Sequence, residues 1–243
     1  MTTPTPQSRR RRQVLSRERI IEAAVGLLDT AGAGALTVRA LSERLSTGSG
    51  AIYHHVGNMG ELLQAATESV VVAALPAPQE SATDPGTEDT GRERLRAAAL
   101  GLYDAVAEHP WLAVQLAVQV TRNPWGTVTP RIFESIGGCV RTLGVPRSDW
   151  FATTSTLVHY ILGATSQNAQ PSDAADDVGV PRAGARRAEF LDSVSKAWKS
   201  LDAGDHPFLH DIADQMRGHN DREQFLTGID LILAGITAVS RPS

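Results

Sequence analysis

The feature that most constrains the fold is a pair of short amphipathic segments separated by a tight turn near the N-terminus. Thr37 is a suitable N-cap for the first segment, residues 37–45, in which apolar side chains repeat at helical spacing. A turn at residues 46–48 precedes the second segment, residues 49–56, which starts with small and polar residues and ends with an aromatic–histidine cluster. Two short helices joined in this way are typical of a helix-turn-helix that reads DNA.

A further helix is predicted on each side of this pair. Ser16 is a suitable N-cap for the preceding helix, and the glycines at 32 and 34 end it. Asn58 and Glu61 have the spacing of a capping box at the start of the following helix. The N-terminal region is therefore expected to hold three helices and a fourth that leads out of it.

The rest of the chain repeats apolar residues at helical spacing, and no stretch alternates as a half-buried strand does. We therefore predict an all-α protein with two helical domains. A disordered basic arm is expected at residues 1–15, the helix-turn-helix domain at 16–60 and a larger helical domain at 61–243. Helices are expected at 92–108, 110–120, 130–143, 148–169, 186–201 and 221–239, with a short piece at 207–216 and a mobile polar linker at about 171–185.

Charge is distributed unevenly along the chain. Residues 1–60 hold eight arginines against four acidic residues, whereas the whole chain carries a net charge of −4. A basic head followed by an acidic body indicates that the head meets a polyanion and the body does not. The alternative is a basic tail that is merely solvated.

Several classes of protein are disfavoured. No apolar run approaches the ~20 residues that span a membrane, and the Thr/Pro/Arg-rich start lacks the apolar centre of a signal peptide. The single cysteine, Cys139, fits a reducing compartment, so we expect a cytoplasmic, nucleoid-associated protein. No nucleophile elbow, phosphate-binding loop or His-Glu-x-x-His motif is present, so we expect no enzyme. A helical adaptor that binds only protein is the other alternative, and the basic arm argues against it.

The small residues at the start of the second helix let its backbone approach base edges, while polar and basic groups around it can hold phosphates. An arginine-rich arm suits phosphates or a narrow minor groove. The expected DNA-binding residues are Arg9, Arg10, Arg11, Arg12, Thr37, Arg39, Thr47, Gly48, Ser49, Gly50, Ala51, Tyr53, His54 and His55. Taken singly, these residues also fit a helical hairpin in a core, in which Tyr53 would be a buried aromatic.

In order, these residues resemble a known family. The segment over residues 20–63 is similar to the N-terminal domain of the TetR family of bacterial transcriptional repressors, nearest to the tetracycline-repressor branch. The resemblance is carried by Ile20-x-x-Ala23-Ala24, Leu36-Thr37-Val38-Arg39-x-Leu41, Gly50-Ala51-Ile52-Tyr53-x-His55-Val56 and Glu61-Leu62-Leu63, and residues 225–233 resemble that branch's last helix. It implies that Arg39 and Ser49 read bases and that Thr37, Tyr53 and His55 contact the backbone.

The chain departs from the family pattern at two positions. Ser46 occupies the turn where the family commonly has glycine, and Met59 stands where a lysine often begins the fourth helix. The phosphate contact of that lysine is therefore in doubt, and the arginine arm is a substitute for it. Gly48 and Gly50 are each expected to cost about 1 kcal/mol relative to alanine within a helix, so we hypothesise that the second helix is partly frayed off DNA.

The resemblance also implies a ligand pocket between the fourth and eighth helices of the body. The ligand would be polycyclic or antibiotic-like, with a metal that bridges it to a histidine as a weaker expectation; otherwise no cofactor and no metal are expected. The alternative for each candidate is an ordinary core residue at helical spacing, which is the more common role of such residues. The candidates are Leu102, Tyr103, Val106, His109, Trp111, Val114, Gln115, Trp125, Phe133, His159 and Asn168.

A dimer is expected because one short recognition helix contacts few bases, and in the family the corresponding helices form a four-helix interface. Gly228 and Gly235 lie seven residues apart and would let another helix approach. The alternative is that these helices pack within one subunit. The expected interface residues are Phe151, Leu157, Val158, Ile161, Phe225, Ile229, Ile232 and Ile236.

We therefore predict a homodimeric, ligand-responsive repressor that binds palindromic operator DNA and is released by a small-molecule inducer. One further pattern stands apart from this function. His206, His210 and Asp214 are spaced four residues apart and would share one face of a short helix. That spacing can bind a metal; the alternative is that the three side chains lie on a solvated helix surface.

Overall fold

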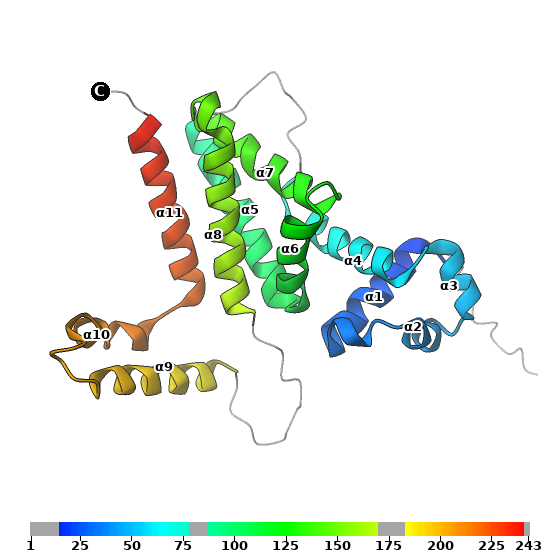
Figure 1. Cartoon of the computed structure of the whole chain (residues 1–243), viewed down its shortest axis with the longest axis horizontal. Coiled ribbons are helices and arrows are strands. Elements are labelled where there is room, and N and C mark those ends of the chain that lie inside the picture. Colours follow the sequence, from blue (N-terminus) through cyan, green and yellow to red (C-terminus); the bar gives the residue numbers. More distant parts are fainter. Residues whose placement is uncertain (1–14, 78–86, 170–182, 241–243) are drawn as a thin grey trace, which may run out of the picture. The chain divides into compact units, whose positions relative to one another are not determined.

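The structure is a computed structural model that describes residues 15–77, 87–169 and 183–240, and it is helical throughout its regular elements (Figure 1). No strand occurs in these ranges, which confirms the all-α prediction. The chain divides into two compact units, residues 1–73 and residues 74–243. The arginine arm and most of the predicted linker lie outside the described residues, although residues 183–185, which were assigned to the linker, begin a helix.

The first unit contains α1 (Arg17–Ala31), α2 (Val38–Leu45), α3 (Ser49–His55) and most of α4 (Met59–Ala74). Its caps are those that the sequence predicted. The hydroxyl of Ser16 accepts a hydrogen bond from the Arg19 amide at 3.3 Å, and the side-chain oxygen of Asn58 accepts one from the Glu61 amide at 2.9 Å. One fully buried core holds these helices together, formed by Ile20, Ala24, Leu28, Leu41, Ile52, Leu62, Ala66 and Val71.

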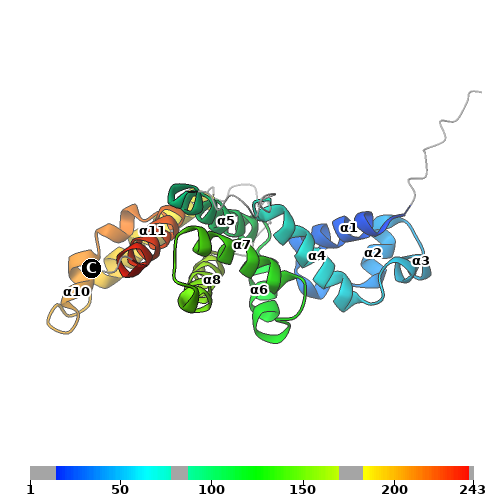
Figure 2. The ribbon, with the colours of Figure 1, turned by 90° about the horizontal axis from the view of Figure 1, so that it is seen from above.

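The second unit contains seven α-helices in its described residues. These are α5 (Glu88–Glu108), α6 (Trp111–Arg122), α7 (Val128–Thr142), α8 (Trp150–Asn168), α9 (Ala183–Lys199), α10 (Pro207–Ile212) and α11 (Asp221–Ser240). Helices α5, α7 and α8 pack on one another, and α11 packs against both α5 and α8 (Figures 1 and 2). Helix α5 begins four residues earlier than predicted because Thr87 caps it, accepting the Thr90 amide at 3.2 Å.

Helices α9 and α10 and the short helix η3 (Gln215–Gly218) pack together. Arg217 joins them electrostatically, since its guanidinium lies 3.1 Å from Asp192 on α9 and 3.4 Å from Asp214 ahead of η3. Lys199 contacts Asp214 at 2.6 Å and Lys196 contacts Asp192 at 2.6 Å. The hydrogen bonds from Lys196 and Lys199 lower the pKa of Asp192 and Asp214, respectively.

The division between the units does not coincide with the predicted domain boundary. The sequence placed the start of the second domain at residue 61, whereas compactness places residues 61–73 with the first unit. The boundary at residue 60 separates DNA-reading helices from the remainder by function, and it stays a prediction. Within the described ranges, no helix combines the length and the apolar character that crossing a bilayer requires.

Candidate nucleic-acid interface and ligand cavity

The turn between α2 and α3 is built around one residue in the left-handed backbone conformation. Ser46 has φ 50° and ψ 48°, and among the described residues it is the only one other than glycine with a positive φ. The Ser46 amide bonds the Glu43 carbonyl at 3.3 Å and the Thr47 amide bonds the Ser42 carbonyl at 3.0 Å. These two backbone hydrogen bonds form the Schellman motif that ends many helices, and glycine usually occupies its left-handed position. Serine at this position is therefore accommodated with some backbone strain.

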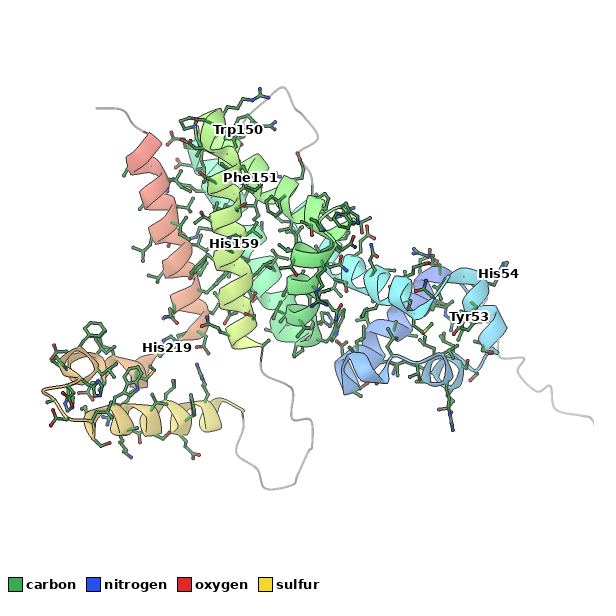
Figure 3. The ribbon with its side chains drawn as sticks, in the orientation of Figure 1. Tyr53, His54, Trp150, Phe151, His159 and His219 are labelled. Carbon is green, nitrogen blue, oxygen red and sulfur yellow. The ribbon has the colours of Figure 1, made fainter. Side chains whose placement is uncertain are left out.

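Helix α3 presents most of its residues outward. Ile52 is its buried residue and anchors it in the head, whereas Ser49, Gly50, Ala51 and His54 are exposed. Tyr53 is 46% exposed, so it is no core aromatic (Figure 3). A seven-residue helix with one buried anchor and a small-residue leading end has the form that a major groove admits.

The position of Gly48 corrects one expectation from the sequence. Gly48 is the N-cap of α3, with φ −82° and ψ 152°, so it lies outside the helix rather than within it. Glycine at an N-cap costs only a few tenths of a kcal/mol relative to a good capping residue. Of the two glycines, only Gly50 therefore carries the helix-interior penalty, and α3 has no side-chain cap.

Arg39 and Thr37 lie at the start of α2. The Arg39 side chain is 88% exposed, and its Nε lies 3.0 Å from the Glu43 carboxylate one turn later. This exposed ion pair holds the guanidinium over α2. Breaking it, for example to let Arg39 contact DNA, costs at most about 1 kcal/mol. Thr37 is exposed but its hydroxyl already accepts the Ala40 amide at 3.2 Å, so its first role is that of an N-cap.

The histidine clusters do not form metal sites in the described residues. The His54 and His55 rings meet edge to face with centroids 5.4 Å apart. His210 bonds the Leu201 carbonyl at 2.8 Å, and Asp214 pairs with Lys199 and Arg217 instead of with histidine. No group of three histidine, cysteine or acidic side chains is placed to hold an ion in these ranges.

The predicted ligand residues differ widely in burial, and their role as ligand contacts stays a prediction. Leu102, Tyr103, Val106 and Trp111 are buried in the second unit, whereas Val114, Trp125 and His159 are exposed. His109, Gln115 and Phe133 are intermediate, and the side chain of Asn168 lies outside the described part of the chain. Of the whole set, His159 lines one cavity and Phe133 lines another, smaller one.

The larger cavity, which we call the α8–α9–α11 cavity, has a volume of about 620 Å³. Figure 1 shows α9 lying across the ends of α8 and α11, and Figure 3 places His219 between α9 and the start of α11. The described lining residues come from all three helices and from the η3 region: His159, Tyr160, Gly163, Ala164, Gln167, Arg187, Phe190, Leu191, Val194, Met216, His219, Asp221, Gln224 and Phe225. Sequence reasoning named only His159 of these as a ligand contact.

Two residues that line this cavity, Tyr160 and Phe225, belong to an aromatic cluster. The Phe225 ring lies 4.8 Å from the Tyr103 ring and 5.8 Å from the Tyr160 ring, so it joins α11 to α5 and α8. The Tyr160 hydroxyl donates to the Phe225 carbonyl at 3.0 Å and occupies the space where a Cβ on Gly228 would stand. The close approach that the sequence predicted at Gly228 is therefore made by a side chain of the same subunit. Burial raises the pKa of both tyrosines, and the nearby Asp221 carboxylate raises that of Tyr103 further.

The smaller cavity is a groove of about 240 Å³ between α7 and α8. Phe133 and Phe151 stack across it with ring centroids 6.4 Å apart, and Gly137 and Gly138 lie beside them. The Arg147 guanidinium lies 5.6 Å from the centre of the Trp150 ring, which also lines the groove. Phe151 is 77% exposed and leaves an apolar ring on the surface of α8 (Figure 3).

Most of the expected dimer residues are already buried within one subunit. Leu157, Val158, Ile161, Phe225 and Ile229 are at most 2% exposed, so they supply no surface to a second chain. They face the core because α8 and α11 pack on α5 and on each other. Ile232 and Ile236 are partly exposed, and Phe151 is the one strongly exposed member of the set.

Comparison with protein families assigns both units. Residues 20–66 match the family described as "Bacterial regulatory proteins, tetR family", and residues 84–240 match "Tetracyclin repressor-like, C-terminal domain". The second match alone covers more than half of the chain. Together they place a helix-turn-helix unit ahead of a helical domain of the tetracycline-repressor type.

Three similar proteins extend this result. The solved structure of the transcriptional regulator SCO7222, a TetR from Streptomyces coelicolor, is 54% identical, covers 94% of this chain and 100% of its own, and has a TM-score of 0.79. The HTH-type transcriptional repressor DrrR1 of Streptomyces coeruleorubidus is 27% identical over 94% of this chain and 80% of its own length. The Streptomyces coelicolor protein ActR, solved in complex with actinorhodin, shares the fold at 24% identity and a TM-score of 0.69, with 92% and 96% of the two chains covered.

Proposed function

The chain belongs to the TetR family of bacterial transcriptional regulators, and from that premise we propose that it is a homodimeric repressor released from palindromic operator DNA by a small-molecule inducer. The observation that carries the DNA-binding part is the outward face of α3. Ile52 anchors that helix while its small leading residues stay exposed, so its backbone can approach base edges. Such a repressor acts where the chromosome lies, which places it in the cytoplasm.

The dimer is proposed to form through the exposed faces of α8 and α11. On α8 the exposed positions Ala152, Thr156, His159 and Gly163 recur three to four residues apart along one side of the helix, and the exposed Phe151 lies next to the first of them. On α11, Leu231 is exposed beside Ala234 and Gly235, and a Cβ at Gly163 or Gly235 would meet nothing within 4 Å. Open small residues let helices of a second copy come close, and a twofold dimer reads two half-sites.

Inducer release is proposed as a population shift. The inducer would bind more tightly to the arrangement of the body in which the two DNA-binding units are wrongly spaced for the operator. The difference between its affinities for this arrangement and for the DNA-binding one sets how far operator affinity falls. The ActR complex with actinorhodin is a precedent within the same fold for a small molecule bound by such a protein. We therefore expect a polycyclic or antibiotic-like inducer, with no metal or other cofactor required.

Operator binding tests this function directly. The full-length protein is titrated against a fluorescent duplex that carries the intergenic DNA next to its own gene, at several salt concentrations. A repressor that neutralises several phosphates gives a linear fall of log affinity with log salt, with a slope of about −0.9 per phosphate. Binding that ignores salt, or that shows no preference for this DNA over random sequence, contradicts the proposal.

The Arg39→Ala variant tests the reading of bases. We expect it to lose about 1–3 kcal/mol of discrimination at one base pair of each half-site. Equal weakening on all sequences would instead make Arg39 a phosphate contact. Arg122→Ala is the matched control, because it removes an exposed arginine from α6 in the second unit, away from the expected DNA-binding residues.

A further inference from the structure

We propose that Ala51 makes each operator half-site selective for thymine, because its methyl group packs against the C5-methyl of that base in the major groove. The inference rests on the proposed function and deepens it by naming a base that α3 recognises. Ser49, Gly50 and Ala51 are the first three residues of α3, and all of them are exposed. In a helix-turn-helix, the N-terminal residues of the second helix are those that contact base edges.

The helical positions of these residues decide which side chain faces the bases. Successive residues of an α-helix are turned by about 100°, so the position of Gly50 lies about 160° from the buried Ile52 and faces directly away from the head. Ala51 lies about 100° from Ile52, and Ser49 lies only about 60° from it. A Cβ at Gly50 would meet nothing within 4 Å, so the backbone there is open to approach by DNA. Ala51 therefore carries the side chain that is turned furthest outward at this end of α3.

The side chains of α3 include none of the types that usually read guanine or adenine. Guanine is typically read by arginine or lysine and adenine by asparagine or glutamine, each through two hydrogen bonds to its base. None of these four residue types occurs between Ser49 and His55. A serine hydroxyl is compatible with more than one base, whereas an alanine methyl has one favourable partner in the major groove, the thymine C5-methyl. Ala51 therefore supplies the base preference at the start of α3.

Selectivity also comes from what the other bases present at the same place. Cytosine carries an amino group there and no methyl, while guanine and adenine present an N7 acceptor. An alanine methyl that covers such a polar atom removes water from it and offers no hydrogen bond in return, which costs free energy. Arg39 on α2 is the expected reader of guanine. The two helices therefore supply different base preferences, guanine from α2 and thymine from α3.

Deoxyuridine in place of thymine tests the contact, because it removes only the C5-methyl and leaves base pairing unchanged. The half-sites are located by footprinting the full-length protein on the intergenic DNA next to its own gene. Each thymine is then replaced in both half-sites at once, and affinity is measured by fluorescence anisotropy. We expect one position at which the substitution weakens wild-type binding about tenfold, which corresponds to about threefold for the methyl contact in each half-site.

Ala51→Gly is the test variant, because it removes the side-chain methyl. It also lowers the helix propensity of α3, but that loss is the same on both duplexes and cancels from the ratio of the two affinities. We expect the two duplexes to bind Ala51→Gly within about twofold of each other. Ala40→Gly is the matched control, because it makes the same change on α2 at a residue outside the expected DNA-binding set, and its ratio should equal that of wild type.

5-Methylcytosine separates the methyl group from the rest of thymine. At the sensitive position, a cytosine–guanine pair in both half-sites should bind wild-type protein weakly. Methylation of that cytosine at C5 returns a methyl to the same place in the groove, so we expect it to recover affinity about threefold or more. Ala51→Gly should show no such recovery, because it has no methyl to make the contact.

The inference is overturned if no deoxyuridine position weakens binding, if the penalty persists in Ala51→Gly, or if 5-methylcytosine gives no recovery in wild type. A penalty that persists in Ala51→Gly would assign the methyl contact to another side chain, such as Tyr53. In each of these cases the protein still binds its operator, so the proposed function stands while this inference fails. A protein that binds no DNA overturns both.

Discussion

Replacing Gly50 with alanine is expected to tighten operator binding, because α3 is a short helix with a weak start. Gly50 lies in the first turn of the seven-residue helix Ser49–His55, whose N-cap, Gly48, makes no side-chain hydrogen bond. A helix of this length is unstable alone and depends on its packing, here on the buried Ile52. A Cβ added at Gly50 would meet nothing within 4 Å, so alanine fits without strain.

The size of the effect follows from helix propensity and from the fraction of α3 that is formed without DNA. Alanine stabilises a helix by about 1 kcal/mol over glycine, which is at most about fivefold in an equilibrium constant. Apparent affinity is reduced by the fraction of molecules that are competent to bind. We expect α3 to be partly frayed off DNA because it contains Gly50 and has no side-chain cap, so Gly50→Ala raises operator affinity between about twofold and fivefold.

Fluorescence anisotropy with operator duplex measures this change, and amide exchange of α3 measures fraying directly. Ala51→Gly is the matched opposite, since Ala51 is the next exposed residue of the same helix and should lose affinity by at least a similar factor. Unchanged affinity in Gly50→Ala, together with slow exchange of α3 in free wild-type protein, would refute the fraying argument. Weakened binding in both variants would show instead that the DNA fits closely against this stretch of α3.

Three further predictions follow from other parts of the chain. Glu43→Gln should strengthen operator binding up to about fivefold, because it frees Arg39 and removes a negative charge near the phosphates; unchanged anisotropy titrations would argue that this pair does not face DNA. Folded protein should react slowly with a thiol reagent and denatured protein quickly, because burial raises the pKa of Cys139; equal rates would contradict its burial. Lysine hydrogen bonds lower the pKa of Asp192 on α9 and of Asp214 ahead of η3, so the stabilisation from these carboxylates is fully present above the ordinary pKa of aspartate and is lost as pH falls through the lowered pKa; protection of the α9 amides, corrected for the intrinsic exchange rate, that does not fall in acid would disprove this.

Local features were predictable because their causes lie within a few residues. Ser16, Thr37 and Asn58 were identified as caps from sequence alone, and each makes the expected hydrogen bond to an amide three residues later. The turn at Ser46 was recognised as a departure from glycine, and its positive φ explains why glycine is usual there. Capping and turn geometry depend on nearby chain only, so the pattern of residue types was sufficient.

Residues of the body were placed less well because their neighbours come from distant segments. Leu157 and Phe151 both read as apolar positions of one amphipathic helix, yet the first is fully buried and the second is 77% exposed. Periodicity shows that a helix has an apolar face but not which neighbour covers each position. The contact of Tyr160 with Gly228 and Phe225 joins residues about 65 positions apart, and no local signal announces it.

The sequence by itself determined the all-helical class, the caps of the head and membership in a family of DNA-binding regulators. These follow from short-range patterns, in which each residue type has a direct local consequence. Only the tertiary structure decided which faces of α8 and α11 remain open and where a cavity lies. Arg187, Phe190 and Asp221 line that cavity because an ion pair joins Arg187 on α9 to Asp221 at the start of α11, and contact between distant segments is the property that a linear pattern does not encode.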